Sequence, residues 1–319
     1  MDLDVVNMFI IAGGTLAIPI LAFVASFLLW PAALIKVYHW YWRRRLRMQV
    51  DYAEYEGYHF CYSHRGYPGT RPSVLMLHGF SAHKDMWLGV VKFLPKNVHL
   101  VCVDMPGHEG TTRTSAVDYS IEGQVKRIHQ FVKSIRMSKK PFHLIGTSMG
   151  GNVAGVYAAR HLSDLCGVTL ICPAGLQYPT ESKFVQRLRE LEKTQNSDGI
   201  PLIPSTPEEM EEMLKLCSYV RFKIPKQVFI NKIINHHLSF LELVGDLTDT
   251  SISVYCILQV LDVSGASVLA KAIPGSQVHL LDNCGHSVVM ERPRKSAQLI
   301  MDFIIAQQNV GINSTKKLS

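Results

Sequence analysis

Short apolar runs alternate with amphipathic segments through the middle of the chain. The runs at 73–77, 99–103, 142–145 and 167–172 are rich in large apolar side chains. Such runs are typical of strands buried on both faces of a parallel sheet. Because the residues between them have helical periodicity, the pattern predicts an α/β fold with a mostly parallel, doubly wound sheet.

Two local patterns on either side of these runs are well marked. Residues 49–66 alternate around Glu56-Gly57, which predicts a β-hairpin. Residues 120–136 predict a helix with one apolar face. That face carries Ile121, Val125, Ile128, Val132 and Ile135.

The alternation stops between about 175 and 250. This stretch contains Pro201, Pro204 and Pro207, an acidic helix start at 208–212 and an apolar run at 228–243. We expect it to form a lid inserted between strands and lying over the active site; a plain surface excursion is the alternative. The alternation then resumes with a strand near 252–258, a helix near 264–272, a strand at 277–281 and a closing helix at 294–306.

The N-terminus carries the longest apolar segment. No charged residue lies between Val5 and Ile35, and the stretch from Phe9 to Leu29 is long enough to cross a bilayer as a helix. A cleaved signal peptide and a buried core helix are the alternatives. Acidic residues at the extreme N-terminus and the length of the run favour an anchor. We therefore divide the chain into a transmembrane anchor with a basic juxtamembrane segment (1–47) and an α/β domain (48–319).

The positive charge of the chain is concentrated beside this segment. The formal net charge is +7, and Lys36, Arg43-Arg44-Arg45 and Arg47 follow the apolar run. By the positive-inside rule, this placement predicts a cytosolic domain. No interleaved basic and aromatic surface recurs elsewhere, so we expect no nucleic-acid partner. The seven scattered cysteines form no CxxC pair and no HExxH is present, which predicts free thiols and no metal site.

The candidate nucleophile is Ser148 in Gly146-Thr147-Ser148-Met149-Gly150. In isolation G-x-S-x-G is a common Gly/Ser turn. Here it follows a predicted strand and precedes a predicted helix, which is the context of a nucleophile elbow. A serine at such a turn stands clear of the backbone and points at substrate.

The partners of this serine can be proposed from position in the chain. His286 follows a predicted strand, lies on a loop after Gly285 and comes late in the sequence, so we expect it to be the general base. Two backbone N–H groups should hold the oxyanion. They belong to Met149, directly after the nucleophile, and to Phe80, in the loop after the 73–77 strand.

Four motifs together carry a family resemblance. They are His78-Gly79-Phe80, Asp104-Met105-Pro106-Gly107-His108, the elbow with Gly151, and Asn283-Cys284-Gly285-His286. They resemble the α/β-hydrolase family, in which the triad follows the order serine, acid, histidine. With the N-terminal span and Val288–Pro293, the chain resembles the membrane-anchored monoacylglycerol lipases of that family.

The resemblance implies a serine hydrolase with an α/β-hydrolase fold. It implies hydrolysis of monoacylglycerols such as 2-arachidonoylglycerol, with lysophospholipids and bis(monoacylglycero)phosphate as further substrates. It also implies a late endosomal or lysosomal membrane. We expect lipid and the bilayer as partners, and neither a metal nor an organic cofactor.

The resemblance covers residues 1–226 and 260–319 but breaks between them, where the triad acid belongs. By register the family's aspartate falls on Leu258, which cannot orient an imidazole. Asp262 is the nearest carboxylate and our candidate acid, although it is also placed to cap a helix. Asp246 and Asp249 are weaker candidates.

The sequence leaves two other functions open. The missing acid is compatible with a catalytically impaired hydrolase fold that acts as a membrane interaction protein. An acyltransferase with the same nucleophile is the second alternative. Some relatives carry an H-x-x-x-x-D motif, and Glu291 stands where its aspartate would be.

Overall fold

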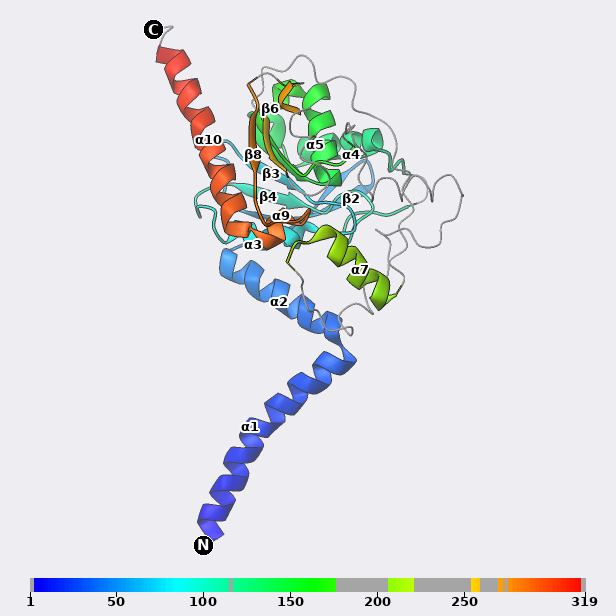
Figure 1. Ribbon diagram of the computed structural model, residues 1–319, viewed down its shortest axis with the longest axis vertical. Helices are drawn as coiled ribbons and strands as arrows, with labels where there is room; N and C mark the ends of the chain where they lie inside the picture. The colour runs from blue at the N-terminus through cyan, green and yellow to red at the C-terminus, as the bar shows by residue number, and fades with distance from the viewer. Residues whose placement is uncertain are drawn as a thin grey trace.

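The computed structural model describes residues 3–114, 117–175, 206–220, 254–258, 269–271, 273 and 275–316. These residues form an eight-stranded sheet in the order β1-β2-β4-β3-β5-β6-β7-β8 (Figure 1). The strands are β1 (Gln49–Tyr55), β2 (Tyr58–Arg65), β3 (Val74–Leu77), β4 (Leu100–Val103), β5 (Phe142–Thr147), β6 (Leu165–Ile171), β7 (Val254–Leu258) and β8 (Gln277–Leu280).

Only one end of the sheet is antiparallel. β1 and β2 form the predicted hairpin, whose turn residues Glu56 and Gly57 both have positive φ. β2 then pairs antiparallel with β4, and every pair from β4 to β8 is parallel. The predicted mostly parallel, doubly wound sheet is confirmed.

Helices connect the parallel strands. α4 begins where the sequence predicts, because the Ser120 hydroxyl accepts a hydrogen bond from the Gly123 N–H and so caps it. The closing helix α10 is longer than the predicted 294–306. The α-helices around the sheet are α3 (Leu88–Val91), α4 (Ile121–Ser134), α5 (Met149–Arg160), α9 (Val288–Glu291) and α10 (Pro293–Lys316), and a 3₁₀ helix η1 (Lys84–Trp87) precedes α3.

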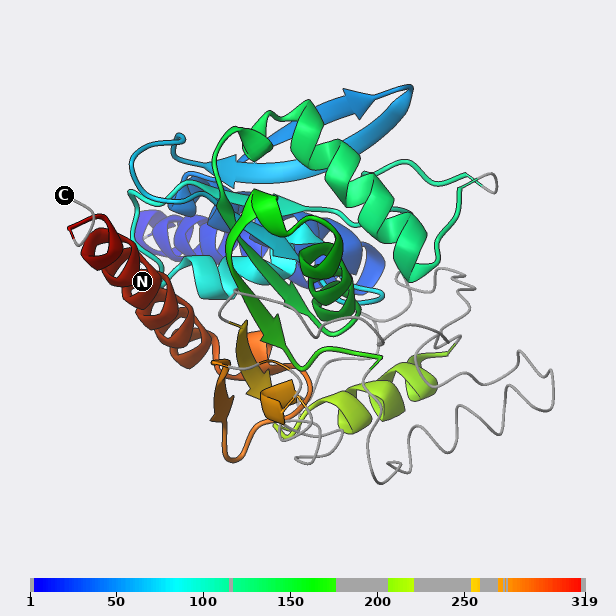
Figure 2. The same cartoon turned by 90° about the horizontal axis from the view of Figure 1, so that it is seen from above.

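Each face of the sheet carries its own hydrophobic core. Along β3, Leu75 and Leu77 point to the core shared with α4 and α5, whereas Val74 and Met76 point to the core shared with α3, α9 and α10. Side chains alternate between the faces of a strand, so a strand covered on both faces is apolar throughout. Figures 1 and 2 show α5 and α10 on opposite sides of the sheet.

Two helices precede the sheet. α1 (Leu3–Leu29) contains no charged residue after Asp4, buries none of its side chains in the protein, and is long and apolar enough to cross a membrane. α2 (Pro31–Leu46) follows after Trp30, with proline at its start and Arg47 in a left-handed conformation at its end. It packs against α3 of the domain.

The described part of the expected lid is α7 (Pro207–Cys217) and the residues after it. Thr206 caps this helix by accepting a hydrogen bond from the Glu209 N–H. The remainder of 175–250 lies outside the described residues, and so do Asp246, Asp249 and Asp262. Of the helix expected over 264–272, residues 269–271 are described, and they are helical.

Candidate active site

Ser148 lies at the sharp turn between β5 and α5. Its backbone has φ 55° and ψ −121°, a combination that an L-residue rarely adopts. The turn is fixed by hydrogen bonds: the Ser148 N–H donates to the Ile171 carbonyl at 2.9 Å, and the Ser148 carbonyl accepts from the Ala174 N–H at 3.0 Å. The strain is therefore supported by β6 and the residues after it, as expected of a nucleophile elbow.

Two glycines make this turn possible. A Cβ at Gly146 would lie 2.0 Å from the Gly150 carbonyl oxygen, and a Cβ at Gly150 would lie 2.5 Å from the His78 carbonyl oxygen. Both clashes are with backbone, which cannot move aside cheaply. The first and last residues of G-x-S-x-G are thus required sterically.

His286 faces the nucleophile. Its Nε2 lies 2.8 Å from Ser148 Oγ, within hydrogen-bond distance. Desolvation by the surrounding protein lowers the pKa of His286 below its ordinary value of 6.5. The ring is therefore neutral at pH 7, the state in which Nε2 can take a proton from the hydroxyl.

The other ring nitrogen of His286 is buried without a hydrogen-bond partner among the described residues. In a triad this Nδ1–H donates to a carboxylate, which orients the ring and stabilises the imidazolium. β7 ends at Leu258, and Asp262 follows four positions later, beyond the described residues. The candidate base therefore faces Ser148, and no acid that pairs with it is among the residues that the structure describes.

The loop after β3 lies directly against the nucleophile. A Cβ at Gly79 would lie 3.1 Å from Ser148 Cβ and 3.6 Å from Ser148 Oγ. The Phe80 N–H is the next donor along this loop. The Met149 N–H opens α5, where a helix has no internal partner for its first N–H groups. One proposed oxyanion donor thus follows the serine directly, and the other follows the glycine that lies against it.

His78 shapes this loop. It is fully buried, and its Nε2 accepts a hydrogen bond from the Met105 N–H at 2.8 Å. Nδ1 therefore carries the proton and donates to the Gly79 carbonyl at 2.7 Å. Both ring nitrogens of His78 are engaged with backbone, so it holds the oxyanion loop to the residues after β4.

A buried ion pair supports the same loop from the other end. Lys84 Nζ donates to Asp104 Oδ2 at 2.7 Å, and the Lys84 N–H donates to Asp104 Oδ1 at 2.7 Å. Burial alone would lower the pKa of Lys84, but the Asp104 carboxylate outweighs it and the pKa is raised. Sequence reasoning singled out Asp104 only as part of a motif and missed Lys84.

Glu291 was also missed as a member of the site. One of its carboxylate oxygens accepts from the Gly285 N–H at 2.9 Å, next to His286; the other accepts from the Val220 N–H at 2.8 Å, just after α7. Ser287 N–H donates in addition to the Cys217 carbonyl at 2.9 Å. The described part of the expected lid is therefore bonded directly to the loop that holds His286.

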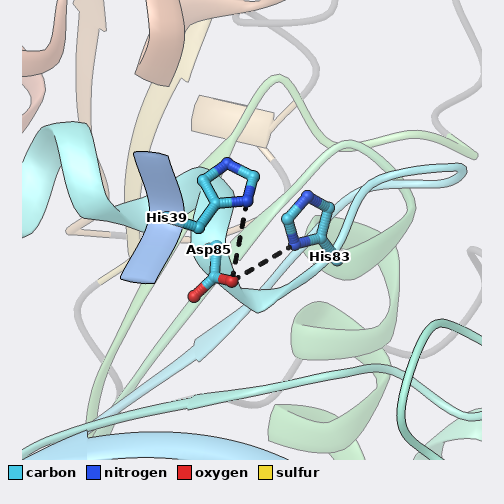
Figure 3. Close-up of side chains that lie close together, drawn as sticks. All are labelled: His39, His83 and Asp85. Atoms are coloured by element: carbon cyan, nitrogen blue, oxygen red, sulfur yellow. Dashed lines mark ion pairs between the residues drawn. The ribbon is translucent and has the colours of Figure 1, made fainter. Parts of the chain in front are cut away.

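Among the described residues, two clusters elsewhere combine metal-ligand side chains. In the first, His39, His83 and Asp85 converge, with both imidazoles within 4.0 Å of the same Asp85 oxygen (Figure 3). The Arg43 guanidinium also binds that oxygen. A divalent cation would meet this fixed positive charge, so the geometry favours an ion-pair cluster over a metal site.

The second cluster consists of His129, His161 and Asp164. The two imidazole rings stack with their centroids 3.8 Å apart, and the Tyr157 hydroxyl donates to Asp164 Oδ2 at 2.7 Å. The oxygen nearest to His129 is thus already a hydrogen-bond acceptor, and we assign this cluster to packing between α4 and the end of α5.

Ser148 has a strained backbone and lies between a parallel strand and a helix. It is within hydrogen-bond distance of His286 and lies against Gly79 of the loop after β3. These features define a nucleophilic hydrolase of the α/β class. Comparison with known proteins agrees. A model of the alpha/beta hydrolase family matches residues 74–299. The chain therefore belongs to the alpha/beta hydrolase family.

Full-length relatives are also found. The chain is 65% identical to the monoacylglycerol lipase ABHD6 of Rattus norvegicus and 64% identical to that of Homo sapiens, with all of each chain covered. The rat alignment spans 339 positions, more than the 319 residues of this chain. The relatives thus carry residues without a counterpart here.

Solved structures give the same fold. A bacterial membrane phospholipase A, described as a virulence factor, superposes with a TM-score of 0.75 at 25% identity, covering 94% of this chain and 99% of its own. The carboxylesterase CesB of Bacillus subtilis superposes with a TM-score of 0.65 at 14% identity, covering 84% and 97%. The second likeness concerns the fold alone.

Proposed function

We propose that this chain is a membrane-anchored serine hydrolase that cleaves monoacylglycerols to fatty acid and glycerol. The observation that carries the proposal is the 2.8 Å contact between Ser148 Oγ and His286 Nε2 at a strained elbow. The name of its full-length relatives, monoacylglycerol lipase, supports the substrate class. Lysophospholipids and bis(monoacylglycero)phosphate are the further candidate substrates.

The geometry supports a two-step reaction. Ser148 Oγ attacks the ester carbonyl while His286 Nε2 takes its proton, and the N–H groups of Phe80 and Met149 hold the oxyanion. His286 returns the proton to the leaving glycerol oxygen, which leaves an acyl group on Ser148. Water, deprotonated by the same nitrogen, then releases the fatty acid and restores the hydroxyl.

The anchor defines where this reaction takes place. α1 would cross the bilayer, and the cations of α2 would keep the hydrolase domain on the cytosolic side. We propose a late endosomal or lysosomal membrane, on the basis of the sequence resemblance. A lipid substrate would then reach Ser148 from the same membrane that holds the enzyme.

The test is hydrolysis by the full chain in detergent or in lipid vesicles. We expect release of arachidonate from 2-arachidonoylglycerol by the wild type and none by Ser148→Ala. Release that persists in the Ser148→Ala variant would overturn the assignment of the nucleophile. If the folded wild type releases no arachidonate, the proposed lipase activity is wrong.

A catalytically impaired hydrolase fold is the second candidate, and one observation favours it: His286 Nδ1 has no partner among the described residues. The relatives' additional residues support the same alternative. Turnover by the wild type separates the two candidates, and replacing Asp262 with Asn tests whether that carboxylate is the acid. If Asp262 is the acid, turnover falls by about 10⁴-fold. If turnover is unchanged, Asp262 is not the acid, and matched Asp246→Asn and Asp249→Asn variants test the others.

A further inference from the structure

α2 presents two different faces. The face toward the domain carries partly buried side chains at helical spacing, including His39, Trp42 and Leu46, and the last two pack against the core beneath α3. The opposite face carries large aromatic side chains in water-accessible positions. Tyr38, Trp40 and Tyr41 are between 48% and 59% exposed.

The inner face is held to the domain by charge as well as by packing. Asp85 of η1, whose side chain is only 5% exposed, binds the Arg43 guanidinium and is approached by His39 and His83 (Figure 3). Lys92 Nζ lies 4.8 Å from the centre of the Trp42 ring. The rotation of α2 about its own axis is therefore fixed relative to the domain, and so is the direction of the aromatic face.

The surroundings of the outer face point to one occupant, a lipid surface. α2 follows α1 after a sharp bend at Trp30-Pro31 and runs across the direction of α1 (Figure 1). Residues 31–47 contain five Lys and Arg residues and no Asp or Glu. Exposed aromatics beside cations, directly after a membrane span, are the composition of a helix that lies among phospholipid headgroups.

We propose that α2 lies in the bilayer–water interface, with Tyr38, Trp40 and Tyr41 inserted among the headgroups of anionic phospholipids. This rests on the proposed function, in which α1 spans the membrane. The helix then does more than connect the anchor to the domain. It fixes which side of the hydrolase domain faces the lipid.

The side so chosen carries α7 and the residues after it, which are bonded to the loop that holds His286. α7 lies at the same end of the domain as α2 (Figure 1), and it ends in exposed Leu216, followed by exposed Tyr219 and Val220. Val220 N–H and the Cys217 carbonyl are bonded to Glu291 and Ser287, beside His286. An acyl chain leaving the bilayer at these apolar side chains would meet the histidine loop first.

The insertion of α2 can be measured without any catalysis. The full chain is placed in vesicles of phosphatidylcholine and phosphatidylserine whose acyl chains are brominated near the carbonyl end, because bromine quenches tryptophan at contact. The emission of Trp40 is the difference between the wild type and Trp40→Phe. We expect this difference to be quenched in brominated vesicles. If the emission of Trp40 is the same in brominated and plain vesicles, the proposal is wrong.

The functional consequence is tested with a triple variant, Tyr38→Ser, Trp40→Ser and Tyr41→Ser. The matched control replaces exposed aromatics of the domain, Tyr52→Ser and Tyr67→Ser, which are 68% and 86% exposed. We expect the triple variant to lose about tenfold in kcat/KM for a monoacylglycerol embedded in vesicles, because less apolar surface enters the interface. Its kcat/KM for a water-soluble short-chain ester should equal that of the wild type.

Each result has one meaning. Loss on vesicles with retained activity on the soluble ester supports the proposal, and the soluble ester also reports that the variant is folded. Equal activity on vesicles in the triple variant and the control contradicts it. A wild type that cleaves neither substrate contradicts the proposed function instead, and the quenching result then still decides the placement of α2. If Trp40 is not quenched and the chain cross-links as a dimer, the aromatic face of α2 instead contacts a second copy of this chain.

Discussion

Ser148 and His286 are separated by 138 positions in the sequence, and the parallel sheet brings them within hydrogen-bond distance. Their meeting could be predicted because each occupies a position with a local signal: a G-x-S-x-G between strand and helix, and a Gly-His after a late strand. Glu291 and Lys84 carry no such signal, because their roles depend on which backbone groups fold back onto them. Asp262 was predicted from proximity in sequence alone and stays a prediction.

The pH dependence of catalysis follows from the surroundings of His286. A base works only when neutral, and desolvation lowers its pKa below 6.5, so the neutral form persists to lower pH than in an exposed histidine. We expect the acidic limb of the kcat/KM profile to have its midpoint below pH 6.5. A midpoint above 6.5 would mean that a carboxylate pairs with Nδ1 in the working enzyme.

Glu291 is predicted to position the histidine. Glu291→Gln offers one acceptor oxygen to two N–H groups, so the Gly285 backbone and the attached imidazole lose a constraint. We expect kcat to fall by about tenfold, since small misplacements of catalytic groups are costly, with KM within about twofold of the wild type.

The matched control for Glu291 is Glu212→Gln, because Glu212 is an exposed carboxylate on α7 that forms an ion pair with Lys215. It should leave kcat unchanged. Glu291→Asp, which keeps two acceptor oxygens, should recover part of the lost activity. Equal kcat values for Glu291→Gln and the control would remove Glu291 from the site.

At the scale of elements, most of the sheet could be predicted. Strands buried on both faces are apolar throughout, so they can be recognised in the sequence as short apolar runs. The hairpin, the capped α4 and the elbow were predicted for the same kind of local reason. The docking of α2 onto α3 could not be predicted, because Asp85 and Arg43 are 42 positions apart and charged residues usually mark surface. The polar contacts between α7 and the histidine loop are likewise long-range.

The ion pair between Lys84 and Asp104 should dominate the stability of the oxyanion loop. Asp104→Asn leaves a buried ammonium without its counter-charge, and we expect the free energy of unfolding to fall by about 3 kcal/mol. The control is Arg160→Gln, which removes an exposed pair with Glu122 and should cost under about 1 kcal/mol. Thermal unfolding of both variants measures the difference; equal midpoints would contradict it.

At the scale of the whole molecule, the family, the sheet and the apolar N-terminal helix agree with what the sequence predicts. The lid stays a prediction, because most of 175–250 lies outside the described residues. What joins the parts is a continuous chain of contacts. It runs from α2 through the Arg43–Asp85 pair to Lys84 and the oxyanion loop.

The anchor makes a separate prediction. If α1 crosses the bilayer, the full chain should remain in the membrane pellet after extraction at alkaline pH. Replacing Ile18 and Leu21 with Arg should release it, because each charge at the centre of a span costs about 3 kcal/mol on insertion. Replacing Ile18 and Ile20 with Leu should not. Release of the wild type would contradict a spanning anchor.

The most direct test of the central claim is the rate at which a fluorophosphonate acquires a covalent bond to the folded chain, with the modified residue located by mass spectrometry. We expect an adduct on Ser148. It should form at least about a hundredfold more slowly in His286→Ala than in the wild type, because the base that activates the hydroxyl is gone. An adduct on another residue, or equal rates in wild type and His286→Ala, would contradict the account.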